Sequence, residues 1–235
     1  MPFDKEDTET RRFQRLDGSQ VRTPFMRGRG SQAVMEYDGF KVLKLTYHPH
    51  CLPHWQDKYG RGRNRNTKQQ EDERPRFSMC IFLPDDHDGL PRLMDKMASC
   101  PSFLWDHMPS ESVKVSELRL PKFKLSFSNR INGVLKAMGI EAAFEEDTAD
   151  LSDMLERENH LVSEHVFHEV VVEVNEEGTE AAASTACVIR KLCSCGLPVN
   201  FVADHPFAFF VVEEVSGVVV FMGHLLDPTK SEHEA

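Results

Sequence analysis

The chain has 235 residues, enough for one large domain or two small ones with a sizeable hydrophobic core. Its formal net charge of −10 argues against affinity of the whole protein for nucleic acid or an anionic membrane. The N-terminus lacks the apolar segment of a secretory signal, and no apolar run is long enough to span a bilayer. The cysteines lack the spacing of a disulfide framework, so we expect reduced thiols and a cytoplasmic location; they are Cys51, Cys80, Cys100, Cys187, Cys193 and Cys195.

The N-terminal part predicts an exposed arm followed by strands that turns separate. Residues 1–15 are mostly charged and are expected to form the arm. Residues 16–19 (Leu-Asp-Gly-Ser) have the composition of a tight turn, and a strand is expected over 21–26. A second turn at 37–40 leads into residues 40–45, where apolar and polar residues alternate as in a half-buried strand.

Residues 48–76 form a polar segment that differs from its surroundings. A zinc site would need a second, separated pair of ligands to close a tetrahedron, and none follows at ordinary spacing. A basic run with few aromatic neighbours is a weak signal for phosphate or nucleic-acid binding. We expect a disordered loop insertion without metal or nucleic acid, and keep both as alternatives because of the potential metal ligands His48, His50, Cys51 and His54 and the basic residues Lys58, Arg61, Arg63, Arg65 and Lys68.

The remainder alternates apolar strands with short helices. Residues 90–98 place apolar side chains at helical spacing, and Gly139 ends an amphipathic helix. Two continuous apolar runs near the C-terminus, joined by a turn, predict a buried hairpin. The signals predict an α+β fold with helices at 90–98, 103–105 and 131–138 and strands at 77–84, 113–120, 120–127, within 160–174, 207–212 and 218–222.

The segment from Val174 to Ala186 runs from the end of a predicted strand into a polar turn and then into a run of very small residues. Alanines that follow Thr179 are typical of the start of a helix. The alternative is an extended chain, in which Thr179, Ala181, Ala183 and Thr185 share one face. Such a segment could form a loop outside the sheet and later enter the sheet as a strand.

This segment resembles the hinge and reactive-centre loop of the serpins, and its Glu-Glu-Gly-Thr-Glu-Ala-Ala-Ala wording is closest to plant serpins. Residues 201–207 (Phe-Val-Ala-Asp-His-Pro-Phe) and 217–224 resemble the C-terminal strands of that family. The resemblance implies a serpin fold of mixed and antiparallel sheets, a few helices and an exposed loop at 176–200. It covers only the latter part of a serpin, so residues 1–235 are expected to form one serpin domain that lacks its N-terminal half.

Serpins are suicide substrates of proteases, so the resemblance implies a serine or cysteine protease as partner, no enzymatic activity and no cofactor. In that mechanism the cleaved loop inserts into the main sheet, and the protease remains trapped as an acyl-enzyme. The resemblance therefore implies a serine protease inhibitor. Because the missing part includes one strand that would receive the loop, our hypothesis for this chain is cleavage as a protease substrate, without inhibition. The alternatives are a non-inhibitory binding protein, self-association through the uncovered sheet surface, and the extracellular location of many serpins.

The resemblance also assigns roles to individual residues. The reactive bond falls between Leu192 and Cys193, with Arg190 or Lys191 as alternative cleavage positions or as solvated loop residues. Glu176 would pair with Lys122 at the top of the hinge, or form an ordinary exposed pair. His168 would help to close the main sheet or be a hydrogen-bonded strand histidine, and Phe207 would anchor the core. The hinge comprises Glu176, Glu177, Gly178, Thr179, Glu180, Ala181, Ala182 and Ala183.

Overall fold

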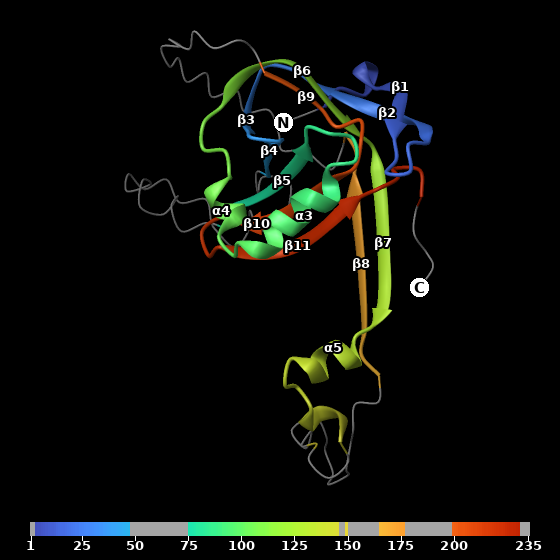
Figure 1. The fold of residues 1–235 in the computed structure, drawn as a ribbon, viewed down its shortest axis with the longest axis vertical. Coiled ribbons are helices and arrows are strands. Elements are labelled where there is room, and N and C mark those ends of the chain that lie inside the picture. Colours follow the sequence, from blue (N-terminus) through green and yellow to red (C-terminus); the bar gives the residue numbers. More distant parts are fainter. Residues whose placement is uncertain (1–2, 48–74, 146–148, 150–164, 177–198, 231–235) are drawn as a thin grey trace, which may run out of the picture. The chain divides into compact units, whose positions relative to one another are not determined.

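The computed structural model describes residues 3–47, 75–145, 149, 165–176 and 199–230 (Figure 1). The chain divides into two compact units, Met1–Phe123 with Val174–Thr229 and Lys124–Glu173 with Lys230–Ala235. The single domain expected over 1–235 stays a prediction. Nearly all of the expected insertion at 48–76 lies outside the described residues. Within the described parts, no helix has the length and apolar character needed to cross a membrane.

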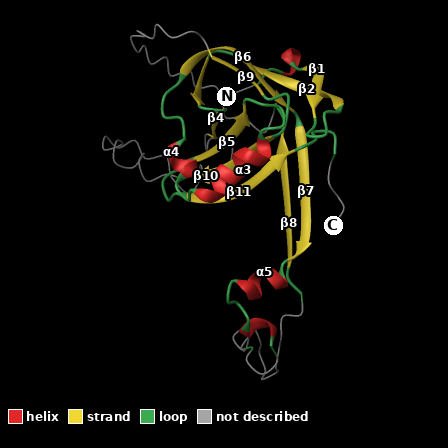
Figure 2. Cartoon of the chain, viewed as in Figure 1, coloured by secondary structure: helices red, strands yellow, loops and turns green. Residues whose placement is uncertain are grey.

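The first unit is built on a nine-stranded sheet, with the helices α3 (Leu90–Ser99) and α4 (Phe103–Asp106) (Figure 2). The order is β1-β2-β6-β3-β4-β5-β10-β11, and β9 pairs with β6 in parallel while the other pairs are antiparallel. The strands are β1 (Glu9–Gln14), β2 (Gln20–Gly28), β3 (Ser31–Tyr37), β4 (Phe40–Tyr47), β5 (Phe77–Pro84), β6 (Val113–Pro121), β9 (Val199–Val202), β10 (Phe207–Glu213) and β11 (Val218–Leu225).

The N-terminal segment is largely exposed, as expected, but residues 5–14 mostly form regular structure and are not a free arm. A short 3-10 helix (Lys5–Asp7) is followed by β1, which pairs with β2 along its whole length. The side chains of Phe3 and Phe13 are buried, while charged side chains between them remain exposed. The strand β1, which buries one aromatic ring, could not be predicted because most of its side chains are polar or charged. The predicted turn is present, with Gly18 at a φ of 80° that favours glycine.

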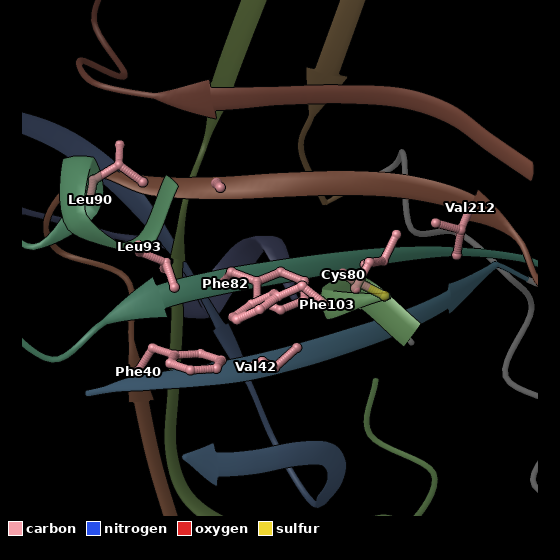
Figure 3. Packing of buried hydrophobic residues seen from close by; sticks show 10 residues of the cluster. Phe40, Val42, Cys80, Phe82, Leu90, Leu93, Phe103 and Val212 are labelled. Carbon is pink, nitrogen blue, oxygen red and sulfur yellow. The ribbon is translucent and has the colours of Figure 1, made fainter. Parts of the chain in front are cut away.

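The core beneath α3 and α4 is formed by β4, β5 and β10 (Figure 3). The ring of Phe82 on β5 lies 6.2 Å from that of Phe40 and 6.1 Å from that of Phe103, measured between centroids. Every residue of β5 after Phe77 is buried, because the sheet covers both of its edges and both of its faces are packed. The predicted strands at 40–45 and 77–84 and the helices at 90–98 and 103–105 are confirmed.

The C-terminal hairpin is present, but its predicted burial is wrong for β11. β10 is largely buried, whereas residues 218–222 of β11 are exposed, with Phe221 at 40% and Met222 at 71%. β11 is the last strand of the sheet order, and the described parts of the chain leave its side chains at 218–222 exposed. Close packing begins again at Gly223, where the ring of Phe209 occupies the space next to the glycine. A Cβ atom added at Gly223 would lie 2.8 Å from this ring.

The second unit consists mainly of two paired strands, β7 (Phe123–Arg130) and β8 (Phe167–Val174), which lie side by side (Figure 1). Lys124 and Glu173 form an exposed ion pair of 3.3 Å across them. The helix α5 (Asn132–Ala137) follows β7 and ends before Gly139, which has a φ of 88°. A 3-10 turn (Ala142–Phe144) comes next. The predicted helix at 131–138 is thereby confirmed within a residue at each end.

Candidate functional site

The candidate site is defined by the two points where the described chain meets residues 177–198. The chain leaves at Glu176, directly after β8, and returns at Val199, the first residue of β9. Several predicted site residues lie outside the described residues, so the structure gives no account of them; these are Glu177, Gly178, Thr179, Glu180, Ala181, Ala182, Ala183, Arg190, Lys191, Leu192 and Cys193.

Glu176 is held by two side chains from distant parts of the sequence. Lys122 places its Nζ 2.7 Å from Oε2 of Glu176, and Thr8 donates a hydrogen bond of 2.6 Å to Oε1. Glu176 is buried, with 6% of its surface exposed, while Lys122 is 37% exposed. The carboxylate is therefore satisfied on both oxygens at a place where an unpaired charge would be costly.

Opposing influences act on the ionisation of Glu176. Burial raises its pKa, but the hydrogen bonds from Lys122 and Thr8 and the charge of Lys122 outweigh this and lower the pKa to about 2. The carboxylate is thus ionised at neutral pH, and the first residue of the hinge is fixed by charge. The sequence drew attention to Glu176 and Lys122 but missed Thr8, which lies 168 positions away and belongs to no motif.

The other end of the segment is fixed by backbone pairing. β9 pairs in parallel with β6, with Leu118 opposite Phe201 and Arg119 opposite Val202. Phe201 is fully buried, and the amide of Ala203 donates to the carbonyl of Arg119 at 3.0 Å. The strand β6 and the residue after it therefore hold both ends of the segment.

The distance between the two anchors can be compared with the length of chain that joins them. Val115, where the pairing with β9 begins, is seven residues before Lys122, roughly 23 Å along an extended strand. Residues 177–198 can span roughly 75 Å when extended. The chain between the anchors is about three times longer than the distance between them requires.

The remaining predicted residues include His168 and Phe207. His168 is exposed on β8, in the second unit, where its ring lies 6.4 Å from that of Phe127. Phe207 is fully buried at the start of β10 and packs edge-on against Phe123 at 6.0 Å. Of the six cysteines, the structure describes Cys80 and Cys100, both as free thiols.

Comparison with known proteins identifies the family. The family model described as Serpin (serine protease inhibitor) matches residues 1–228. The chain belongs to the serpin family. Serpin-Z2A of Oryza sativa subsp. japonica is 53% identical over 98% of this serpin chain, and Serpin-ZX of Hordeum vulgare is 42% identical over 97% of it. The plant-type resemblance read from the hinge is thereby confirmed.

A solved structure agrees with the fold of this serpin. The Arabidopsis AtSerpin1 structure, titled as its native stressed conformation, matches 97% of the chain with 38% identity and a TM-score of 0.72. The predicted α+β serpin fold is confirmed by this likeness. The serpin chain spans about half the length of its relatives: 57% of Serpin-Z2A, 53% of Serpin-ZX and 54% of the AtSerpin1 chain.

Proposed function

We propose that this serpin presents residues 176–200 to a serine protease, which cleaves the bond between Leu192 and Cys193. The observation that carries the proposal is the double anchoring of this segment. Glu176 is fixed by Lys122 and Thr8, and β9 is fixed by β6. A protease needs an extended, accessible stretch of substrate, and we propose that the segment between these two fixed ends supplies it.

The chemistry of the first step follows from the protease. Its serine oxygen attacks the carbonyl carbon of Leu192, an acyl-enzyme forms, and the amine of Cys193 leaves with a proton. The chain from Glu176 to Leu192 then has one free end. It can add as a strand to the open edge of β8, whose other edge pairs with β7.

The fate of the acyl-enzyme depends on how many neighbouring strands the inserted loop can pair with. Within the described residues β8 has β7 as its only strand partner, so an added strand gains backbone hydrogen bonds on one side. Each bond contributes about 0.5–1.5 kcal/mol, and a strand between two partners would gain about twice as many. We therefore propose that the acyl-enzyme is hydrolysed faster than insertion of the loop can trap the protease. The chain then behaves as a substrate and not as an inhibitor.

Incubation with chymotrypsin and with trypsin tests this proposal. We expect cleavage within 176–200 with full retention of protease activity, and mass spectrometry of the fragments identifies the bond. Leu192→Ala should abolish chymotrypsin cleavage after position 192, while Leu197→Ala, a matched change in the same loop, should not. A protease complex that survives denaturing electrophoresis would overturn the substrate proposal. Resistance of residues 176–200 to both proteases would overturn the whole proposal.

A second candidate function, binding to a second copy of the chain, is favoured by β11. Residues 218–222 form an uncharged apolar run on a sheet edge that has one partner strand in the described structure. Such an edge exposes unpaired backbone groups together with apolar surface, and two copies of one strand can pair antiparallel about a two-fold axis. We propose a dimer in which the two β11 strands pair.

Light scattering after size exclusion tests the dimer. We expect a mass of two chains at micromolar concentration, and a monomer for Val220→Lys, because lysine on the pairing edge places like charges opposite each other. Met35→Lys on β3 is the matched control, since Met35 is a similarly exposed apolar residue on an interior strand. A monomer at all concentrations, or equal dissociation by both substitutions, would refute the pairing.

A further inference from the structure

A cluster of three potential metal ligands lies apart from the loop anchors, in the first unit. His87 belongs to the turn between β5 and α3, and Asp204 and His205 belong to the connection from β9 to β10. One nitrogen or oxygen of each side chain lies within 4.8 Å of those of the other two. The rings of His87 and His205 meet edge to face, with centroids 4.8 Å apart.

Both ring nitrogens of His205 face oxygen atoms. Nε2 lies 2.7 Å from the carbonyl oxygen of Pro84, which can only accept, so Nε2 carries a hydrogen. In a neutral ring Nδ1 then holds a lone pair, and this atom lies 2.9 Å from Oδ1 of Asp204. A lone pair and a carboxylate oxygen repel each other at this distance unless a proton or a metal ion lies between them. His205 is buried, with 5% of its surface exposed.

Acidic side chains and an opening to solvent lie beside the three ligands. His87 lines an open pocket of about 530 Å³ together with Asp17, Asp85, Asp86, Asp88 and one cationic side chain, Arg15. Arg92 pairs with Asp86 at 2.8 Å and with Asp88 at 3.6 Å, whereas Arg15 pairs at 2.6 Å with Asp227, which does not line the pocket. Acidic side chains therefore outnumber basic ones in the pocket, and a cation can enter through it.

We propose that His87, Asp204 and His205 bind one divalent transition-metal ion of the zinc class. Two imidazole nitrogens and one carboxylate form a donor set that zinc prefers, with water completing the coordination. The hydrogen bond from Nε2 of His205 to Pro84 is the outer contact that orients a metal-binding imidazole through its other nitrogen. The ion would link the turn after β5 to the connection before β10 and so stabilise the first unit.

The test must remove a second possible source of metal binding. The full chain with His48→Ala, His50→Ala, Cys51→Ser and His54→Ala serves as the reference, because these residues could bind zinc on their own. Competition for Zn²⁺ with a chromophoric chelator gives affinity and stoichiometry, and the visible spectrum of Co²⁺ reports the ligand set. We expect one ion per reference chain and a Co²⁺ spectrum with nitrogen and oxygen ligands.

Single substitutions in the reference chain assign the ligands. His87→Asn and Asp204→Asn should each weaken Zn²⁺ binding at least tenfold, and His224→Asn, which changes another exposed histidine of the first unit, should leave it unchanged. Zn²⁺ should raise the melting temperature of the reference and of His224→Asn, but not that of His87→Asn. The proposal is overturned if the reference binds no Zn²⁺, or if it binds Zn²⁺ as tightly after His87→Asn and Asp204→Asn.

Discussion

Strands β5 and β11 are similarly apolar but differ in their surroundings. β5 lies between β4 and β10, and all of its residues after the first are buried. Among the described strands β11 pairs with β10 alone, and residues 218–222 are exposed to solvent. An apolar run thus sets the tendency to form a strand, whereas the position of that strand in the sheet decides whether its side chains contribute to stability.

The same difference means that β5 contributes to the stability of the core, whereas β11 has exposed apolar surface. Removal of apolar area from water stabilises a fold by about 25 cal/mol per Å², and β5 gains this contribution on both faces. In the described structure β11 gains most of it near its C-terminal end, where Phe209 packs over Gly223 and Leu225 is buried. The exposed part of β11 is therefore available to a partner, which underlies the proposed dimer.

The largest effect is expected for Phe82→Ala at the centre of the core. Phe82 on β5 is fully buried against Phe40 and Phe103, so its truncation leaves a cavity and should lower the free energy of unfolding by about 3–5 kcal/mol. Urea unfolding followed by fluorescence measures the change. A loss below about 1 kcal/mol would show that β5 is not the centre of the core.

A smaller loss is expected for Gly223→Ala, where β11 begins to pack. A Cβ at this position would lie 2.8 Å from the buried ring of Phe209, which must shift. Such overpacking should lower the free energy of unfolding by about 1–3 kcal/mol. Gly133→Ala is the matched control for glycine replacement, since a Cβ there meets open space. Equal effects at both positions would contradict the close packing of Phe209.

A loss of about 1 kcal/mol or less is expected for Phe221→Ala, measured on the monomer by the same urea titration. Phe221 is 40% exposed, so less area returns to water and no enclosed cavity forms. The substitution is the direct counterpart of Phe82→Ala, with the same chemical change on the other strand. A loss comparable to that of Phe82→Ala would mean that β11 is covered in solution.

The smallest effect is expected at the turn between β10 and β11. Glu213 accepts hydrogen bonds from the amides of Ser216 at 2.6 Å, Arg76 at 2.9 Å and Val215 at 3.1 Å, and these bonds lower its pKa from 4.5 to about 2. Because the folded pKa is depressed, the stabilisation is complete above about pH 4.5 and is lost as the pH falls toward 2.

Amide hydrogen exchange measures this loss. Protection of the amides of Val215 and Ser216 should fall between pH 4.5 and pH 2, after correction for intrinsic exchange. Glu213→Gln should show weaker protection that does not change over this range. Identical profiles for both proteins would show that the carboxylate does not hold the turn.

Much of the fold could be predicted from local pattern. The strands at 40–45 and 77–84 and the helix at 90–98 were readable because their apolar spacing agrees with their burial. β1 was not readable, since its charged side chains hid the pairing with β2, and β3 gave no strong signal. The burial of β11 was mispredicted because sheet order depends on pairings between distant segments, which periodicity does not encode.

The candidate site was predictable only where a motif carried it. The hinge wording drew attention to Glu176, and the resemblance suggested Lys122 as its partner. Thr8 had no such signal, and the cluster of His87 with Asp204 and His205 joins segments 117 positions apart. Contacts of this kind arise from the tertiary fold, so they are visible only once the strands have been placed.

The interweaving of the last strands with the rest of the sheet has a consequence for the cut protein. β9 is hydrogen-bonded to β6, and β10 lies between β5 and β11, so the piece after residue 192 is held by strands of the other piece. A nicked molecule should therefore migrate as an intact particle until it is denatured. Two separately produced polypeptides, 1–192 and 193–235, are expected to reassemble, which offers a fragment-complementation assay for the integrity of this sheet.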